Sequence, residues 1–274
     1  MSVSEQASLA SRFLALHQRP EPLLMANAWD QGSAKLLASL GFQALATTSS
    51  GFAATLGRLD GEATAAEVLA NAASIVSASG LAVSADLENG YAADPDGVAD
   101  TVALALQAGL AGCSIEDFSG DRETPIYDIP RAVERVAAAV EVAHAGPVHL
   151  VLTARAENYL HRRADLSDTI ARLQAYQEAG ADVLYAPGMR DLAEIRQLVA
   201  ELQRPVNVLA LPGAPSVTEL ASAGVKRVSV GGAFAFAALG AVVHAAQELL
   251  GEGHYGYWDR ASVGASAARG AFSA

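Results

Sequence analysis

The stretch GLAVSADLENGYAADPDGVADTVALALQAGLAGCSIED, residues 80–117, contains one complete strand–helix–strand unit. A near-continuous apolar run, LAVSADL, is followed by a helical segment that Asp94 caps and Pro95 begins. Gly109 follows that helix, since glycine accepts the left-handed conformation at a helix end, and a second apolar run, GCSIED, comes next. Such runs are typical of parallel strands, which are covered on both faces.

The same unit recurs along the chain. Capping-box patterns begin helices at Thr64 with Glu67 and at Ser216 with Glu219, and Pro130 predicts a helix over 130–144. Glycines that follow apparent helix ends are Gly41, Gly80, Gly109, Gly146, Gly180 and Gly224. Strand-like runs occupy residues 23–27, 44–49, 81–87, 112–117, 149–155, 182–187, 205–211 and 227–232. Eight strand-then-helix units in about 250 residues predict an α/β fold, a (β/α)8 TIM barrel rather than an open doubly wound sheet.

The pattern predicts a single domain over residues 1–274, because no linker, charge block or low-complexity stretch marks a second one. Residues 1–20 are expected to form an extra N-terminal helix. Residues 251–274 lack a clear period, so we expect a C-terminal extension that folds over a neighbour or is mobile.

The amino-acid composition argues against some classes of binding partner. The chain has 18 basic and 30 acidic residues among 274, a formal net charge of −12, which argues against nucleic acid but not against a small anionic substrate. No segment is expected to reach the roughly 18 apolar residues of a membrane span, and no signal-peptide core is evident, so we expect a cytoplasmic chain without a membrane partner. The single cysteine, Cys113, permits no internal disulfide and is expected to be a buried structural thiol. The six histidines show no metal-ligand spacing.

Acidic and basic residues end three consecutive strands, at the edge where barrel active sites lie. Asp86 and Glu88 end the third strand, Glu116 with Asp117 ends the fourth, and the fifth ends in Arg155 with Glu157. Carboxylates gathered there repel one another unless a cation lies between them, and Mg²⁺ is the natural choice. Arg155 would supply a planar donor for a substrate carboxylate or enolate oxygen. Backbone N–H groups at Ser49, Ser50 and Gly51 are candidate anion donors.

Each feature also has a structural explanation. Asp86 and Glu88 are alternatively solvated charges before a turn, and Glu116 with Arg155 an ion pair inside the barrel mouth. The run TTSSG at 47–51 is alternatively a plain polar loop, and Trp29 a core residue.

These motifs together resemble the isocitrate lyase/phosphoenolpyruvate mutase superfamily, over about residues 8 to 250. DLENGY at 86–91 is similar to that family's Asp-x-Asp/Glu-x-Gly-aromatic metal motif, and IED at 115–117 to its next acidic motif. Arg155 matches the family's arginine after the fifth strand. SSGF at 49–52, followed by LGRLDGE at 56–62, resembles the substrate-carboxylate loop and its aspartate.

The resemblance implies roles for individual residues. Mg²⁺, or Mn²⁺, would be held by Asp86, Glu88 and Glu116, directly or through waters. Asp86 would also face the substrate, and Arg155 would bind its oxo or carboxylate oxygen. Catalysis would rest on Asp60, Glu116 and Arg155. The substrate carboxylate would be held by backbone amides and a pocket aromatic, contributed by Ser50, Gly51, Phe52 and Trp29. The resemblance also implies a homodimer or homotetramer, with the apolar segment 233–250 exchanged as an eighth helix.

One half of the family site differs. The loop after the fourth strand, FSGDRETPIYD at 118–128, lacks the cysteine, histidine and lysine of the family's lyases, and Cys113 lies too early to replace them. Pro187 and Gly188 stand where related enzymes offer Glu or His. We therefore expect a Mg²⁺-dependent lyase or decarboxylase that acts on a small 2-oxo or 2-hydroxy (di)carboxylic acid through a pyruvate-like enolate. The alternatives are a P–C bond enzyme, of the phosphonopyruvate hydrolase or mutase type, and a non-catalytic homologue that binds a 2-oxo acid.

Overall fold

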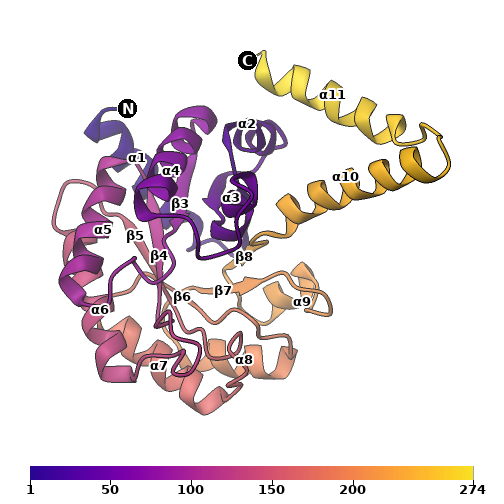
Figure 1. The fold of residues 1–274 in the computed structure, drawn as a ribbon. Helices are drawn as coiled ribbons and strands as arrows, with labels where there is room; N and C mark the ends of the chain where they lie inside the picture. The colour runs from indigo at the N-terminus through magenta and orange to yellow at the C-terminus, as the bar shows by residue number, and fades with distance from the viewer. Residues whose placement is uncertain (274) are drawn as a thin grey trace.

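The computed structural model describes residues 1–273 and shows a closed barrel of eight parallel strands, which confirms the predicted fold (Figure 1). Strands pair in chain order, and β8 closes the barrel against β1. The strands are β1 (Leu23–Ala28), β2 (Ala44–Thr47), β3 (Ala82–Asp86), β4 (Gly112–Glu116), β5 (Val151–Arg155), β6 (Val183–Tyr185), β7 (Val206–Leu209) and β8 (Arg227–Ser229).

Helices follow the strands and cover the barrel. They are α2 (Gln31–Ser39), α3 (Ser49–Thr55), α4 (Ala65–Ser79), α5 (Pro95–Gln107), α6 (Ile129–His144), α7 (Leu166–Glu178), α8 (Leu192–Glu201) and α9 (Val217–Ser222). Both predicted capping boxes are confirmed, as is the cap at Asp94. Five of the six helix-end glycines have a positive φ, but Gly146 does not. The residue before a proline, here Pro147, is pushed toward extended conformations, so the prediction at Gly146 was wrong.

The N-terminal helix α1 (Val3–Leu16) seals the end of the barrel opposite the strand carboxyl ends. Ala10 and Phe13 are fully buried and form one apolar cluster with Leu23, Val151 and Val183 of the barrel. This cluster closes the barrel from below, so any cavity along its axis opens only at the other end.

The last two helices form an arm. Figure 1 shows α10 (Ala233–Gly251) leaving the barrel beside β8 and α11 (Trp258–Phe272) turning back toward α2. Most of the expected C-terminal extension is thus helical, although its sequence carries no clear apolar period. Alanine-rich sequence favours a helix by intrinsic propensity, and a mostly exposed helix needs no apolar period to mark it.

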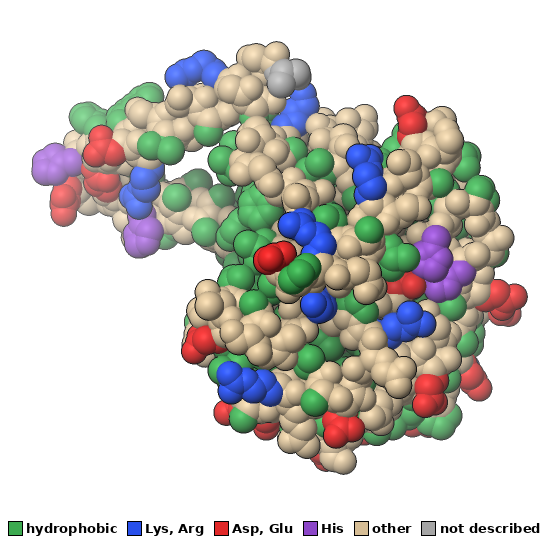
Figure 2. Space-filling view, turned by 180° about the vertical axis from the view of Figure 1, so that it is seen from behind, with side chains coloured by type: hydrophobic (Ala, Val, Ile, Leu, Met, Phe, Trp, Pro, Cys, Tyr) green, Lys and Arg blue, Asp and Glu red, His purple; other side chains and the backbone are tan. Residues whose placement is uncertain are grey.

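Helix α10 is 19 residues long, with a mean hydropathy of 1.5, and only 6% of its most apolar window is buried. By length and composition it is able to cross a membrane, so the expectation that no segment reaches that length was wrong. Figure 2 shows the arm standing out from the body of the molecule with apolar side chains on its surface.

Candidate active site

A cavity of about 190 Å³ opens at the carboxyl ends of the strands. It brings together residues from β2, β3, β5 and the loop before α4, as expected for the active-site end of a barrel. Its wall includes Ser49, Ser50, Asp60, Asp86, Arg155, Tyr185 and Pro187.

Arg155 is the centre of the site's electrostatics. Its Nη1 lies 2.8 Å from Asp86 Oδ1, and its Nη2 lies 2.9 Å from Glu116 Oε2. Nε and Nη2 also donate to Glu157 Oε1, at 2.9 and 2.7 Å. The structural alternative for Glu116 and Arg155 is thus confirmed as a contact. Three of the five guanidinium N–H groups donate in hydrogen bonds, one each on Nε, Nη1 and Nη2, and Nη2 also contacts Glu116, which leaves one N–H on Nη1 for a ligand.

Asp86 is held in place by its neighbours. Its carboxylate accepts from the backbone N–H groups of Ser49 at 3.2 Å and Glu88 at 3.4 Å, as well as from Arg155. Its own N–H donates to Thr47 Oγ1 at 2.9 Å. The side chain keeps 19% exposure, so this oriented carboxylate still faces the cavity.

Glu88 occupies a tight turn behind Asp86. It has φ +49°, and Tyr91 has φ +55°, an uncommon conformation for residues other than glycine. Tyr91 donates its hydroxyl to Glu88 Oε1 at 3.1 Å. Burial, together with the charge of Asp86, raises the pKa of Glu88 to about 7. Burial likewise raises the pKa of Asp60, against a hydrogen bond from Ser49.

The predicted metal ligands surround Arg155 rather than a common point. Among residues 1–273, Asp86, Glu88 and Glu116 do not form a group whose oxygens all lie within 4.8 Å of one another. The mouth nonetheless holds more carboxyl groups than cations, since Arg155 faces the carboxyls of Asp86, Glu116 and Glu157, with Glu88 and Asp60 close by. Hard oxygen donors with excess negative charge fit a divalent cation that keeps several waters. Of the three predicted ligands, Asp86 is the one that lines the cavity in the described chain.

The predicted substrate loop forms the start of α3. Ser50 lines the cavity. The N–H of Gly51 donates to Thr48 Oγ1 at 3.3 Å, and that of Phe52 to the Thr48 carbonyl at 3.0 Å, so both amides are engaged in the first helical turn. A Cβ at Gly51 would lie 2.6 Å from Thr48 Cγ2 and 3.0 Å from Ala235 Cβ. Glycine therefore lets α3 and α10 approach closely beside the mouth.

Trp29 does not line the cavity. It is half-buried, and its carbonyl accepts from Asn71 Nδ2 at 3.2 Å. Its Cβ lies 3.2 Å from the position that a Cβ on Gly51 would take. Trp29 thus supports the substrate loop from behind, which agrees better with the alternative of a packing residue.

Asp117 faces away from the mouth. Its carboxylate accepts from Glu157 N–H at 2.8 Å, Tyr176 hydroxyl at 2.6 Å and Arg172 Nη1 at 3.2 Å. Because neighbouring strand residues point to opposite sides, Asp117 fastens β4 to α7 while Glu116 faces Arg155.

The loop 118–128 forms a small turn of its own. Phe118 pairs with Ile126, and the N–H of Ser119 donates to the Pro125 carbonyl at 2.8 Å. None of its residues lines the cavity in the described part of the chain. Cys113 is fully buried, and burial raises the pKa of its thiol to about 12, which confirms a structural thiol.

Two other features lie far from the mouth. His144 and His149 contact Asp182 through their Nε2 atoms, at 3.0 and 2.9 Å, and their rings stack 4.0 Å apart. The ligand atoms of these three groups lie within 4.8 Å of one another, an arrangement that the sequence spacing of the histidines does not reveal. They join α6 to the N-terminal ends of β5 and β6, where residues generally serve stability.

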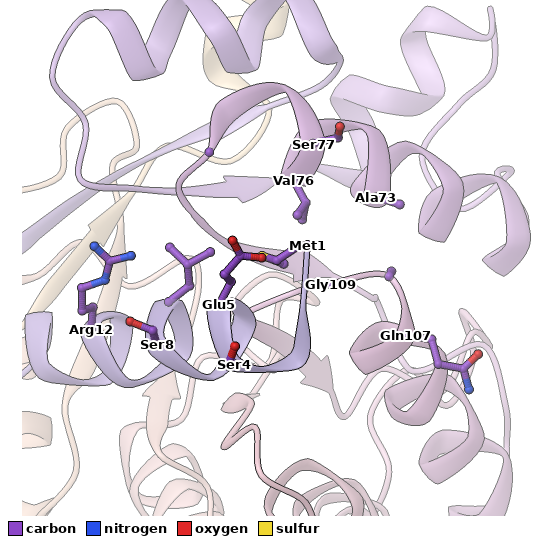
Figure 3. A pocket seen from close by; sticks show the side chains of 13 residues that line it. Met1, Ser4, Glu5, Ser8, Arg12, Ala73, Val76, Ser77, Gln107 and Gly109 are labelled. Carbon is purple, nitrogen blue, oxygen red and sulfur yellow. The ribbon is translucent and has the colours of Figure 1, made fainter.

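A cavity of about 780 Å³ lies between the N-terminal segment, α4 and the end of α5 (Figure 3). Met1, Glu5 and Arg12 line one side, and Val76 and Gly109 another. Gly80 and Gly109, which precede β3 and β4, line it, so it lies away from the carboxyl ends of the strands where barrel active sites form.

Sequence reasoning missed part of the cavity. Asn207 and Arg227 line it from β7 and β8, and Tyr185 from β6. Glu157, noted only as part of a strand end, is the closest carboxylate to Arg155. The available signal was polar residues inside otherwise apolar strand runs, at Asn207 and Arg227.

Comparison with known proteins identifies the family. The family profile described as phosphoenolpyruvate phosphomutase matches residues 13–250. A candidate lyase/mutase from Burkholderia cenocepacia J2315 has a crystal structure with a TM-score of 0.91 and 52% identity, over 93% of this chain and 92% of that one. The 2-methylisocitrate lyase of Escherichia coli is 31% identical, over 77% of this chain and 74% of its own length. The oxaloacetate decarboxylase of Pseudomonas paraeruginosa is 31% identical, over 89% and 86%. The chain therefore belongs to the isocitrate lyase/phosphoenolpyruvate mutase superfamily and is an enzyme of its lyase and mutase class.

Proposed function

We propose that the protein is a Mg²⁺-dependent lyase or decarboxylase that acts on a small 2-oxo or 2-hydroxy (di)carboxylic acid through a pyruvate-like enolate. The observation that carries the proposal is the pairing of Asp86 and Arg155 at the cavity mouth, with one N–H of Arg155 left for a ligand. The similarity to an oxaloacetate decarboxylase over 89% of the chain supports it.

The proposed chemistry places negative charge beside Arg155. In a decarboxylation, the bond to the leaving carboxylate breaks and its electron pair moves onto the 2-oxo group, so that CO₂ departs and an enolate remains. A bound Mg²⁺ would supply Lewis-acid stabilisation of that oxygen. The remaining N–H of Arg155 donates to the same developing charge, in a buried site where such a hydrogen bond is strong. The enolate then takes a proton at carbon, and Asp60, whose pKa burial raises, is the candidate to carry it.

The cavity wall favours a reaction that needs little proton transfer. Among its described residues, the titratable ones are Asp60, Asp86, Arg155, Tyr185 and Arg227. A leaving carboxylate departs as CO₂ without a proton, whereas cleavage to a second carboxylic acid anion requires an acid at its leaving carbon. Decarboxylation of an oxaloacetate-like acid therefore fits this wall best.

The test measures pyruvate release from oxaloacetate, isocitrate, methylisocitrate, citramalate-type acids and phosphonopyruvate, with Mg²⁺ or Mn²⁺ and with EDTA. We expect metal-dependent turnover of at least one acid, lost in Asp86→Ala and retained in the buried control Cys113→Ala. Spontaneous metal-driven decarboxylation is subtracted with an enzyme-free blank. No turnover, or turnover unchanged in Asp86→Ala, would refute the proposal.

The alternatives have their own outcomes. Phosphate release from phosphonopyruvate would favour a P–C bond enzyme, for which the matching family profile is the supporting observation. Metal-dependent binding of a 2-oxo acid in calorimetry without any turnover would favour the non-catalytic homologue.

We also propose that the arm pairs with a second copy of the chain, as a homodimer or homotetramer in the cytoplasm. Apolar side chains spaced along α10 are exposed, among them Phe236 at 50%, Leu239 at 46% and Val243 at 53%. On the barrel, Leu24 of β1 is 45% exposed, although strands of a parallel barrel are normally covered. An arm from a partner would cover such a surface and hide its own apolar face.

Sedimentation velocity tests this assembly. We expect a dimer or tetramer for the wild type and a smaller species for Leu239→Glu with Val243→Glu, while Lys35→Glu leaves the assembly unchanged. A monomeric wild type, or recovery of the protein with membranes, would contradict it.

A further inference from the structure

The floor of the active-site cavity is polar. Ser84, Ser114, Asn207 and Ser229 line the cavity from four different strands, together with Arg227. In most barrels of this kind, branched apolar side chains fill the interior layers. Arg227 begins β8, two residues before Ser229, which places it about 7 Å nearer the sealed end of the barrel. The cavity therefore extends from the charged mouth down to a second arginine.

Every hydrogen-bond partner of Arg227 in the described chain is neutral. Its Nε donates to Asn207 Oδ1 at 2.9 Å, and its Nη1 donates to Thr153 Oγ1 at 3.1 Å. Nη1 also lies 3.5 Å from Nε2 of His17. Burial, reinforced by the charge of Arg227, lowers the pKa of His17 to about 3, so that ring carries no charge at neutral pH. Burial lowers the pKa of Arg227 to about 10, so the guanidinium remains protonated.

No carboxylate lies within 4.0 Å of Arg227 among residues 1–273, although its side chain is only 3% exposed. Arg155 and Arg172 pair with carboxylates, and the buried Arg135 instead donates to three backbone carbonyls. A buried charge without a counter-charge is strongly unfavourable. Arg227 is therefore a buried cation without a counter-charge in the described chain, and an anion in the cavity would supply one.

One end of this guanidinium is left without a protein partner in the described chain. Its Nη2 has no acceptor among the described residues. The side-chain nitrogens and oxygens that are fully buried without a partner are Arg135 Nε and Asn158 Oδ1, and Nη2 of Arg227 is not among them. The atom thus retains some exposure, and Arg227 is among the residues that line the cavity.

We propose that Arg227 is a specificity-determining residue, which binds the second carboxylate of a small dicarboxylic substrate at the cavity floor. This rests on the proposed function, in which the mouth holds the 2-oxo or 2-hydroxy end. The charge of Arg155 is already balanced by three protein carboxylates, whereas that of Arg227 is not. An anionic group of the substrate is therefore stabilised most strongly at the floor. The cavity, at about 190 Å³, is below the roughly 300–1,000 Å³ of drug-sized sites and suits a short acid.

Calorimetry tests the subsite with acids of matched length. Succinate is compared with butyrate, and malonate with propionate, in chloride-free buffer with Mg²⁺. The wild type is expected to bind each diacid about tenfold to a hundredfold more tightly than its partner, since a hydrogen bond to a charged group is worth that much. Arg227→Met should remove this preference and leave the monoacids unchanged. The matched control Arg190→Met, which removes an exposed charge, should retain it.

Other outcomes overturn the assignment. One is that the wild type binds the diacid and the monoacid of a pair with equal affinity. Another is that Arg227→Met still prefers the diacid. Binding of inorganic phosphate that depends on Arg227, without a preference for diacids, would show an adventitious inorganic-anion site instead. If Arg227→Met fails to fold, Arg227→Lys decides, because it keeps the charge and should weaken diacid binding by about tenfold through loss of the planar donors.

The same preparations separate the two proposals. Pyruvate release without any diacid preference refutes the floor subsite alone. A diacid preference that depends on Arg227, without turnover of any acid, refutes the proposed catalysis alone.

Discussion

Removal of Arg155 should lower the free energy of unfolding, by an amount that increases with pH. In Arg155→Met, three carboxylates lose their shared cation, and the side chains of Glu116 and Glu157 are only 9% and 4% exposed. Loss of one partner from a buried ion pair costs about 3–5 kcal/mol of unfolding free energy. For a chain of this size, about 2 °C of melting temperature corresponds to each kcal/mol, so we expect a decrease of about 6–10 °C.

The pH dependence follows from the direction of the pKa shifts. Burial raises the pKa of Glu116 in the folded state, and Arg155 opposes that rise. Without Arg155 the folded-state pKa increases further, so the folded protein binds more protons than the unfolded chain. Stability then falls as the pH rises above the ordinary carboxyl pKa toward the raised one. The deficit of Arg155→Met relative to wild type should therefore be larger at pH 8 than at pH 5.

Thermal unfolding followed by circular dichroism, in metal-free buffer, measures both effects. The matched control is Arg58→Met, because Arg58 pairs with Glu67 at 2.9 Å on the surface, with side chains 40% and 35% exposed. Exposed pairs contribute about 0–1 kcal/mol, so this control should change little. A melting temperature of Arg155→Met equal to that of the control, or a deficit that shrinks as the pH rises, would refute the account of the mouth.

Three further predictions concern single residues. Mg²⁺ affinity, measured by calorimetry, should increase as the pH rises through about 7, because Glu88 must lose its proton to bind the ion. The variant Glu88→Gln should lose this pH dependence, and a Glu88→Gln variant with the pH profile of the wild type would be contrary evidence. Gly51→Ala should lower the unfolding free energy by about 1–3 kcal/mol through the clash with Thr48, while Gly146→Ala, where no atom lies within 4 Å of the added Cβ, should be near neutral in the same denaturant titration. Cys113→Ala should keep its turnover number, since the thiol is fully buried; a well-folded but inactive variant would show a catalytic thiol after all.

The barrel could be predicted from the sequence because its signals are local. Caps such as Asp94 with Pro95, and glycines such as Gly80 at φ +64°, mark helix ends without reference to distant residues. The meeting of Asp86 with Arg155 was also predictable, since both end parallel strands of one barrel. The arm was not, because the direction of α10 and the packing of α11 on α2 depend on tertiary contacts that leave no apolar period.

The depth of the cavity could not be predicted from the sequence, for a different reason. Asn207 and Arg227 are polar residues within apolar strand runs, but strands buried on both faces show no alternation that would tell which side these residues face. The engagement of the Gly51 and Phe52 amides within α3 likewise depends on a cap by Thr48 that a loop interpretation did not include. The contact of His144 and His149 with Asp182 joins residues at least 33 positions apart along the chain.

Calorimetric binding of oxalate, a stable mimic of the pyruvate enolate, tests the central claim most directly. The site should bind oxalate only when Mg²⁺ is present, and Asp86→Ala should lose that binding while it folds like the wild type. The reason is that Asp86 is the oriented carboxylate at the mouth and Arg155 keeps one free N–H for the ligand. Oxalate binding that is equal with and without Mg²⁺, or unchanged in Asp86→Ala, would contradict the account.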